Sequence, residues 1–162
     1  MKTLNTRWMR ILGYAGLVPF LGLAGLAALF QGSDLASMFA QYNFVYALCI
    51  VSFLGAVHWG IALGLSKRSE AIYLAGQTPA EFETRAFVWG VVPSLLAWLI
   101  GAFAPADYTL YMLATVLLVV WWVDRWMLVP LKAFEEYLRL RNHLTLGAVL
   151  GLLLTASVAQ MV

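Results

Sequence analysis

Residues 43–65 read NFVYALCIVSFLGAVHWGIALGL, and this stretch decides the fold. It contains no Asp, Glu, Lys or Arg, and a helix of this length is about 34 Å long. The hydrocarbon core of a bilayer is about 30 Å thick, and about 20 apolar residues cross it. The stretch is therefore predicted to be a membrane-spanning helix, and the apolar pattern before it extends that helix back to Ser33 or Asp34.

Four other stretches are long and apolar enough to do the same, at residues 11–30, 86–104, 108–128 and 144–162. The composition agrees, because 63% of the residues are hydrophobic and only 11% are charged. A soluble domain carries about a quarter charged residues. We therefore predict an all-α membrane protein, a five-helix transmembrane bundle that forms one domain over residues 1–162.

The basic residues all fall on one side of the predicted membrane. They precede the first span, lie between the second and third, or lie at or between the fourth and fifth: Lys2, Arg7, Arg10, Lys67, Arg68, Arg85, Arg125, Lys132, Arg139 and Arg141. The loops on the other side hold only Asp34 and Asp107 as charged residues. Because basic residues favour the cytoplasmic side, the N-terminus is expected inside and the C-terminus outside.

Two connecting segments on the basic side carry local signals. Residues 78–81, Thr-Pro-Ala-Glu, form a capping box with proline at the first helical position, so the third helix is expected to begin near Pro79. Residues 131–143 place apolar side chains on one side of a helix and pair Glu135 with Arg139 at i,i+4. This segment is predicted to be a short amphipathic helix at the inner interface.

The first and third spans share a short pattern. Residues 16–19 read Gly-Leu-Val-Pro and residues 90–93 read Gly-Val-Val-Pro, each following a basic residue by a similar interval. A parallel duplication of a helical hairpin, followed by a fifth helix, explains this pattern. Chance resemblance between apolar segments is the other explanation, and both stay open.

His58 and Asp124 are the ionisable residues that the sequence places inside spans. Helix rise puts Asp124 about 7 Å, and His58 about 10–12 Å, from the inner ends of their spans. Such groups usually face the bundle interior or a wet cavity, so the two can pair if their helices are neighbours. The alternatives are a histidine that only bridges helices, and an Asp124 that pairs with Arg10 or Arg85 at the interface.

The two prolines suggest where further polar groups gather. Pro19 and Pro93 each leave a backbone carbonyl free one turn earlier, at nearly the depth of His58 and Asp124. A polar pocket in the inner half is therefore expected, with inner tryptophans either as its walls or as an interfacial belt. The candidate ligand or proton-path residues are His58, Trp59, Asp124, Pro19, Pro93, Ser94, Trp89 and Tyr14.

Small residues in the spans indicate close helix approach, either within the bundle or between copies of the chain. The motifs are Gly60-xxx-Gly64 and Gly147-xxx-Gly151, and the glycines expected to serve packing are Gly55, Gly60, Gly64, Gly147 and Gly151.

The sequence offers no reaction. No Gly-rich phosphate loop, serine triad or H-E-x-x-H motif occurs, so an enzyme is not expected. Two histidines and one cysteine are too few for a zinc-type ligand set, so no metal site is expected. Three functions remain open: a binding or assembly component with a polar pocket, a small proton-linked transporter or channel, and a haem, porphyrin or quinone binding protein with His58 as ligand. The expected partners are the lipid bilayer, another membrane protein or a second copy of the chain, and not nucleic acid.

The chain also resembles a known family through four elements. These are residues 16–20 (GLVPF), residues 52–60 (SFLGAVHWG), residues 91–94 (VVPS) and residues 137–145 (YLRLRNHLT). In these elements it is similar to the family of unknown function shared by proteobacterial inner-membrane proteins and the mitochondrial transmembrane protein 69. The resemblance implies a multi-pass membrane protein; together with the charge pattern, the expected location is the bacterial inner membrane with a cytoplasmic N-terminus. The resemblance implies no activity and no site residues.

Overall fold

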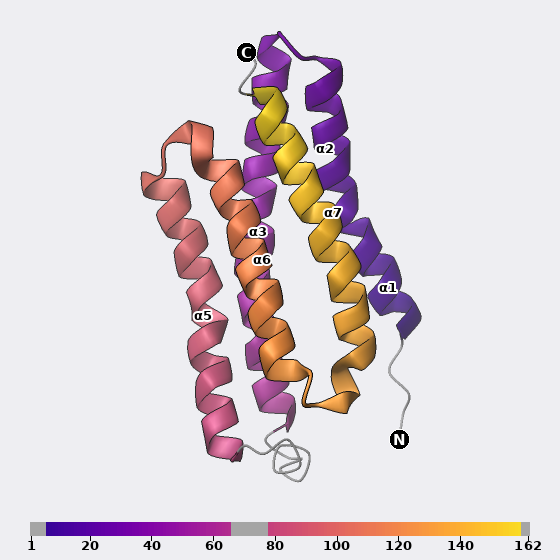
Figure 1. The fold of residues 1–162 in the computed structure, drawn as a ribbon, viewed down its shortest axis with the longest axis vertical. Helices are drawn as coiled ribbons and strands as arrows, with labels where there is room; N and C mark the ends of the chain where they lie inside the picture. Colours follow the sequence, from indigo (N-terminus) through magenta and orange to yellow (C-terminus); the bar gives the residue numbers. More distant parts are fainter. Residues whose placement is uncertain (1–5, 66–77, 160–162) are drawn as a thin grey trace.

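The computed structural model describes residues 6–65 and 78–159, nearly all of them helical (Figure 1). Within these residues, five helices are long and apolar enough to cross a membrane, and no strand occurs. They span Thr6–Leu29, Asp34–Leu65, Pro79–Phe103, Ala106–Leu128 and Glu135–Ala159. The prediction of an all-α, five-helix membrane bundle is confirmed.

The first spanning helix is broken at Gly16 into α1 (Thr6–Ala15) and α2 (Leu17–Leu29). The hydroxyl of Tyr46, from the next helix, donates to the Gly16 carbonyl at 2.9 Å, so the break is held by a side chain. Pro19 stands in the first turn of α2, where its missing N–H costs no bond within the helix. The helix break at Gly16 therefore lies before Pro19, the proline that was expected from the sequence to bend this span.

The second spanning helix, α3, runs over Asp34–Leu65 and begins where the apolar pattern places it. A tight turn joins it to α2: Ser33 donates its hydroxyl to the Phe30 carbonyl at 2.6 Å. Gly32 has a φ of +82°, in the left-handed region that glycine adopts without strain.

The third and fourth spanning helices are α5 (Pro79–Phe103) and α6 (Ala106–Leu128). The expected capping box opens α5: Thr78 Oγ1 accepts from the Glu81 N–H at 3.3 Å, and the Glu81 carboxylate accepts from the Thr78 N–H at 3.0 Å. Helix α5 continues through Pro93, so this proline does not break it.

The prediction of a separate amphipathic helix over residues 131–143 is wrong. A short 3₁₀ turn, η1 (Lys132–Phe134), leads directly into α7 (Glu135–Ala159), which is one continuous helix. The fifth span therefore begins about two turns before residue 144. Leu138 and Arg141 are buried against the bundle, which explains why these turns continue the spanning helix.

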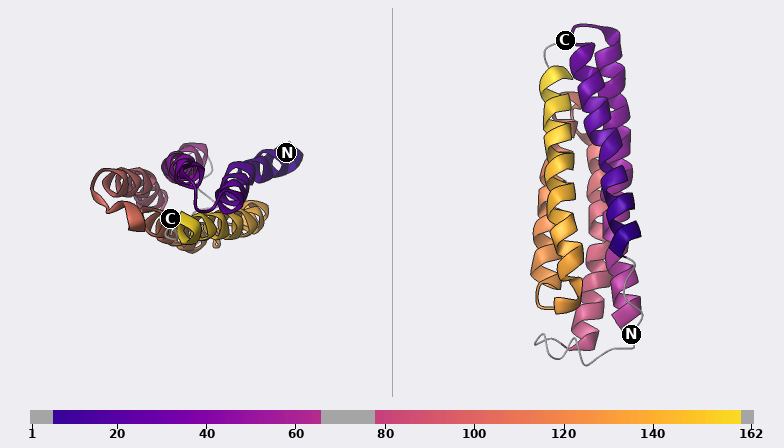
Figure 2. Two further views of the ribbon diagram at one scale, coloured as in Figure 1. Left: turned by 90° about the horizontal axis from the view of Figure 1, so that it is seen from above. Right: turned by 90° about the vertical axis from the view of Figure 1, so that its right-hand side faces the viewer.

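The helices form a bundle in which α3 contacts α2, α5, α6 and α7. Seen from above, α3 lies on one side and α7 on the other, with α5 and α1 towards the two extremes (Figure 2). The largest core cluster gathers around Val51, Leu113, Leu117, Val120 and Leu152. Large apolar side chains also cover the outside, including Leu29 and Phe103, which are 80% and 73% exposed. Such a surface suits contact with lipid.

The described arginines belong to the starts of α1, α5 and α7 and to the end of α6, and these helix ends point towards the bottom of Figure 1, which we name the basic end. They are Arg7 and Arg10 in α1, Arg85 in α5, Arg125 in α6, and Arg139 and Arg141 in α7. Asp34 and Asp107 lie at the opposite end, in the first turns of α3 and α6.

Some of the glycines expected to serve helix packing lie at close contacts between helices, and others do not. A Cβ on Gly55 would overlap the Gly90 carbonyl oxygen, so α3 and α5 meet backbone to backbone. Gly147 and Gly151 approach Leu17 and Phe20 of α2 less tightly, since a Cβ on either glycine would lie 2.9 Å from its neighbour.

Gly60 and Gly64 make no close contact within the described part of the bundle, so packing between copies of the chain stays as the prediction for them. A Cβ on either residue would have no neighbour within 4 Å. These two glycines lie on a side of α3 that faces away from its neighbours, whereas Gly55 lies on the side that meets α5.

Candidate functional site

A cluster of three charged or ionisable side chains lies inside the bundle, in the half nearer the basic end. His58 Nε2 is 3.3 Å from Asp124 Oδ1, and Arg141 Nε is 2.8 Å from Asp124 Oδ2. The three residues come from α3, α6 and α7, and each is at most 4% exposed. The structure thus brings His58 and Asp124 together, as their depths suggest, and adds a third member that the sequence analysis placed at the interface.

The interfacial partners suggested for Asp124 are engaged elsewhere. Arg10 donates to the Glu136 carboxylate at 2.6 Å. Arg85 lies with its guanidinium carbon 5.7 Å from the centroid of the Trp126 ring. The charge that balances Asp124 is therefore the buried Arg141.

Arg141 points inward because its helical neighbour holds α7 against α6. The Asn142 side-chain oxygen accepts from Trp121 Nε1 at 2.8 Å and from Arg125 Nη1 at 3.4 Å. Because these hydrogen bonds hold Asn142 against α6, Arg141, the residue before it, faces the interior of the bundle. Arg141 then continues a buried stripe at helical spacing with Leu138 and Thr145.

Several buried polar atoms of this region make no hydrogen bond. They include Asp124 Oδ1, Arg141 Nη2 and Thr145 Oγ1. Thr145 is unusual, because the hydroxyls of Thr115 and Thr155 donate to the carbonyl four residues earlier in their own helices. Buried polar groups are nearly always paired, so the unpaired ones need a physical explanation, such as a bound molecule or an ordered water.

A cavity of about 150 Å³ is lined by two of the residues that carry these atoms, Arg141 and Thr145. It lies among α1, α2, α3, α6 and α7, and Arg141 and Thr145 are the residues with polar side chains on its wall. The rest of the wall is apolar or glycine and includes Gly16, at the helix break. Leu12 and Phe53 also line it and are 66% and 65% exposed, so the cavity reaches the outer surface of the bundle.

Three of the tryptophans line a separate groove. A groove of about 470 Å³ between α5 and α6 is lined by Trp89, Trp122 and Trp126, together with Arg85. Trp89 Nε1 is buried and has no hydrogen-bond partner.

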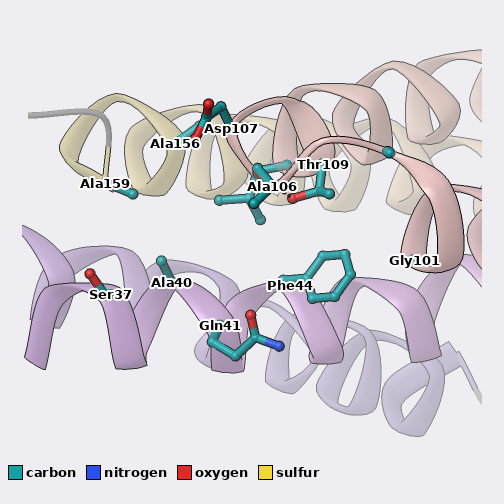
Figure 3. A pocket seen from close by; sticks show the side chains of 12 residues that line it. Ser37, Ala40, Gln41, Phe44, Gly101, Ala106, Asp107, Thr109, Ala156 and Ala159 are labelled. Carbon is teal, nitrogen blue, oxygen red and sulfur yellow. Dashed lines mark hydrogen bonds between the residues drawn. The ribbon is translucent and has the colours of Figure 1, made fainter. Parts of the chain in front are cut away.

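A third hollow lies at the opposite end of the bundle. It has a volume of about 400 Å³ and separates α3 from the start of α6 and the end of α7 (Figure 3). Gln41 and Phe44 stand on the α3 wall, with Asp107 and Thr109 across from them. It is remote from the buried cluster, since it contains none of the basic-end residues.

Comparison with known proteins gives one match. Residues 5–157 fit the family model described as a protein of unknown function, DUF3429. The chain belongs to the DUF3429 family. No curated protein and no solved structure matches it. The family match covers the buried cluster and the cavity, but it assigns no role to any residue, so the DUF3429 site has to be argued from geometry.

Other candidates from the sequence do not join the DUF3429 cluster. Ser94 donates its hydroxyl to Val91 of its own helix, and Pro93 packs against Gly55 in the contact between α3 and α5. Pro19 stays in the first turn of α2. Of the two proline-bent helices expected to enclose a pocket, only the first is interrupted, at Gly16 one turn before Pro19, and the cavity lies beside that break.

Two aromatic candidates are also engaged elsewhere. Trp59 donates its Nε1–H to the Phe87 carbonyl at 2.9 Å, across the contact between α3 and α5. The Tyr14 hydroxyl lies 3.0 Å from Nδ1 of His143, on the outside of the contact between α1 and α7.

The sequence analysis missed Arg141 and Thr145. A signal was present: residues 138, 141, 145, 148 and 152 are spaced three and four apart and are all buried in α7. Continuing the apolar side of residues 131–138 into the fifth span would have placed Arg141 and Thr145 on the inward face.

Proposed function

We propose that this DUF3429 protein is a non-enzymatic binding component of the bacterial inner membrane, with its N-terminus in the cytoplasm. The clustering of arginines at one end supports that orientation, because basic residues favour the cytoplasmic side. Within the family, we place it in the branch shared by proteobacterial inner-membrane proteins and the mitochondrial transmembrane protein 69. What it binds is another membrane component, held in the half of the bundle nearer the cytoplasm.

One observation carries the binding proposal. Arg141 donates its Nε–H to Asp124. Its Nη2 is buried and has no hydrogen-bond partner, and the residue lines the cavity. A buried charged donor without a partner costs free energy. A ligand oxygen in the cavity would remove that cost, and the unpaired Thr145 hydroxyl, one turn further along α7, could donate to the same ligand.

The test is native mass spectrometry of the protein purified in a mild detergent. We expect a non-covalently bound molecule on the wild-type protein, with occupancy reduced in Thr145→Val, which removes the hydroxyl but keeps the shape. Thr115→Val is the matched control, since Thr115 is an exposed residue of α6 and does not line the cavity. Equal occupancy in Thr145→Val and wild type, or no bound molecule on the wild type, would contradict the proposal.

A proton-linked transporter is the second candidate, and the contact between His58 and Asp124 favours it. An imidazole 3.3 Å from a carboxylate inside a membrane bundle is a common arrangement in proton relays. If it transports protons, proteoliposomes should acidify in response to a membrane potential, and His58→Gln should abolish this. Uptake that is unchanged in His58→Gln would remove the candidate.

A further inference from the structure

We infer that the cavity beside Arg141 and Thr145 holds the ring of a neutral, membrane-soluble quinone, with the tail of that molecule in the surrounding lipid. The inference rests on the proposed binding function and names its ligand class. Three properties of the cavity support it: the kind of polar group it presents, its charge balance and its size.

The cavity presents hydrogen-bond donors. Arg141 Nη2 can only donate, and the Thr145 hydroxyl is unpaired and can donate as well. Both belong to residues of the wall, and the backbones of these two residues are about 6 Å apart along the axis of α7. The ligand therefore has to bring acceptor oxygens into an otherwise apolar space, as a ring carbonyl does.

The charge balance of the cluster favours an uncharged acceptor. Arg141 is already neutralised by Asp124, 2.8 Å away, and both side chains are at most 5% exposed. A carboxylate or phosphate would add a second negative charge where water cannot screen it, and a buried charge without a counter-charge is costly. A carbonyl oxygen accepts from Arg141 and Thr145 without that cost.

The volume of the cavity is that of one six-membered ring, and its opening beside Leu12 and Phe53 leaves room for small substituents on that ring. A buried apolar cavity of about 150 Å³ is large enough for benzene, and this cavity has about the same volume. Phe20, Leu54 and Leu117 supply apolar walls for the ring faces. A haem or a phospholipid head group with its glycerol is too large for this space.

The cavity also has a route for a tail. Leu12 in α1 and Phe53 in α3 line it and are exposed on the outside of the bundle. An isoprenoid tail can therefore leave between α1 and α3 directly into the bilayer, without crossing a polar surface. The break at Gly16 lies beside this opening.

The test is equilibrium binding of decylubiquinone to the detergent-purified full-length protein, followed by quenching of tryptophan fluorescence. We expect saturable binding that is about fivefold weaker in Thr145→Val, the loss typical of one hydrogen bond. Arg141→Lys keeps the charge beside Asp124 but removes the free guanidinium nitrogen, and we expect about a tenfold loss. Thr115→Val and Arg139→Lys, at exposed positions of α6 and α7, should bind like the wild type.

Two further arms separate this inference from others. Palmitate and phosphatidylglycerol, offered at the same concentrations, should bind at least tenfold more weakly than decylubiquinone. Tighter binding of either anion would overturn the neutral-ring inference, and so would decylubiquinone binding that is equal in Thr145→Val and wild type. If native mass spectrometry finds a Thr145-dependent ligand that decylubiquinone does not displace, the inference fails while the proposed binding function stands.

Discussion

Arg141 of α7 and Asp124 of α6 form an ion pair inside the bundle, with Nε and Oδ2 2.8 Å apart and side chains 5% and 1% exposed. Neither residue reaches water, so each has its opposite charge as its main electrostatic partner. This pair fixes the rotation of α7 about its axis relative to α6. It thereby also sets the position of Thr145 on the cavity wall.

Removing one member of this pair should destabilise the protein strongly. Asp124→Asn leaves Arg141 buried without a counter-charge, for which we expect a loss of about 3–5 kcal/mol in the free energy of unfolding. Thermal or denaturant unfolding in detergent measures it. The control is Glu135→Gln, which breaks an ion pair with Arg139 whose side chains are both 67% exposed, and which should leave the unfolding midpoint unchanged. Similar midpoints for the two variants would show that Asp124 and Arg141 are not a buried pair.

A second buried polar contact joins three helices in the other half of the bundle. Asn43 of α3 is 0% exposed and donates to Thr155 Oγ1 at 2.7 Å and to the Phe20 carbonyl at 3.3 Å. Asn43→Ala should cost about 1–3 kcal/mol in unfolding free energy, because both bonds are lost in an apolar setting. Gln41→Ala, at an exposed site two residues earlier, should stay within about 0.5 kcal/mol of wild type. Equal stabilities would contradict this role of Asn43.

Local chemistry made some of the fold predictable from the sequence. Apolar runs of bilayer length gave the five spans, and the capping box at Thr78 and Glu81 gave the start of α5, because both signals act within one segment. The similar depths of His58 and Asp124 made their contact one of the alternatives, since helix rise converts residue number into position along the membrane normal, but depth did not show that their helices are neighbours.

The rotation of each helix about its axis was harder to predict. Arg141 looked interfacial because the orientation rule treats every basic residue near a span as a loop charge, whereas here Asp124 compensates it inside the bundle. Gly60 and Gly64 matched a packing motif, yet Gly55 makes the contact, since the partner's position selects which face of α3 is used. The hairpin duplication stays a prediction: the first span breaks at Gly16, whereas α5 is continuous through Gly90.

The close contact between α3 and α5 predicts opposite outcomes for two glycines of one helix. Gly55→Ala places a methyl group against the Gly90 carbonyl oxygen, so it should lower the free energy of unfolding by about 1–3 kcal/mol. Gly60→Ala meets no neighbour and should raise it by up to about 1 kcal/mol through helix propensity. Unfolding midpoints of the two variants in the same detergent decide the matter, and a destabilising Gly60→Ala would show that this face of α3 is occupied in the membrane.

The proposed orientation predicts the behaviour of reporter fusions in a bacterial host. Alkaline phosphatase fused after Gly32 or at the C-terminus should be active, because both points follow an odd number of spans and lie outside. The same enzyme fused after Val129, between α6 and α7, should be inactive, and a green fluorescent protein fused there should fluoresce. The physical reason is the arginines near that end, which resist transfer across the membrane. As a control, full-length protein carrying either reporter at the C-terminus should accumulate to similar levels. If the phosphatase is active after Val129 and inactive after Gly32, the orientation is the reverse of the one proposed. The cavity beside Arg141 then lies in the outer half of the bilayer.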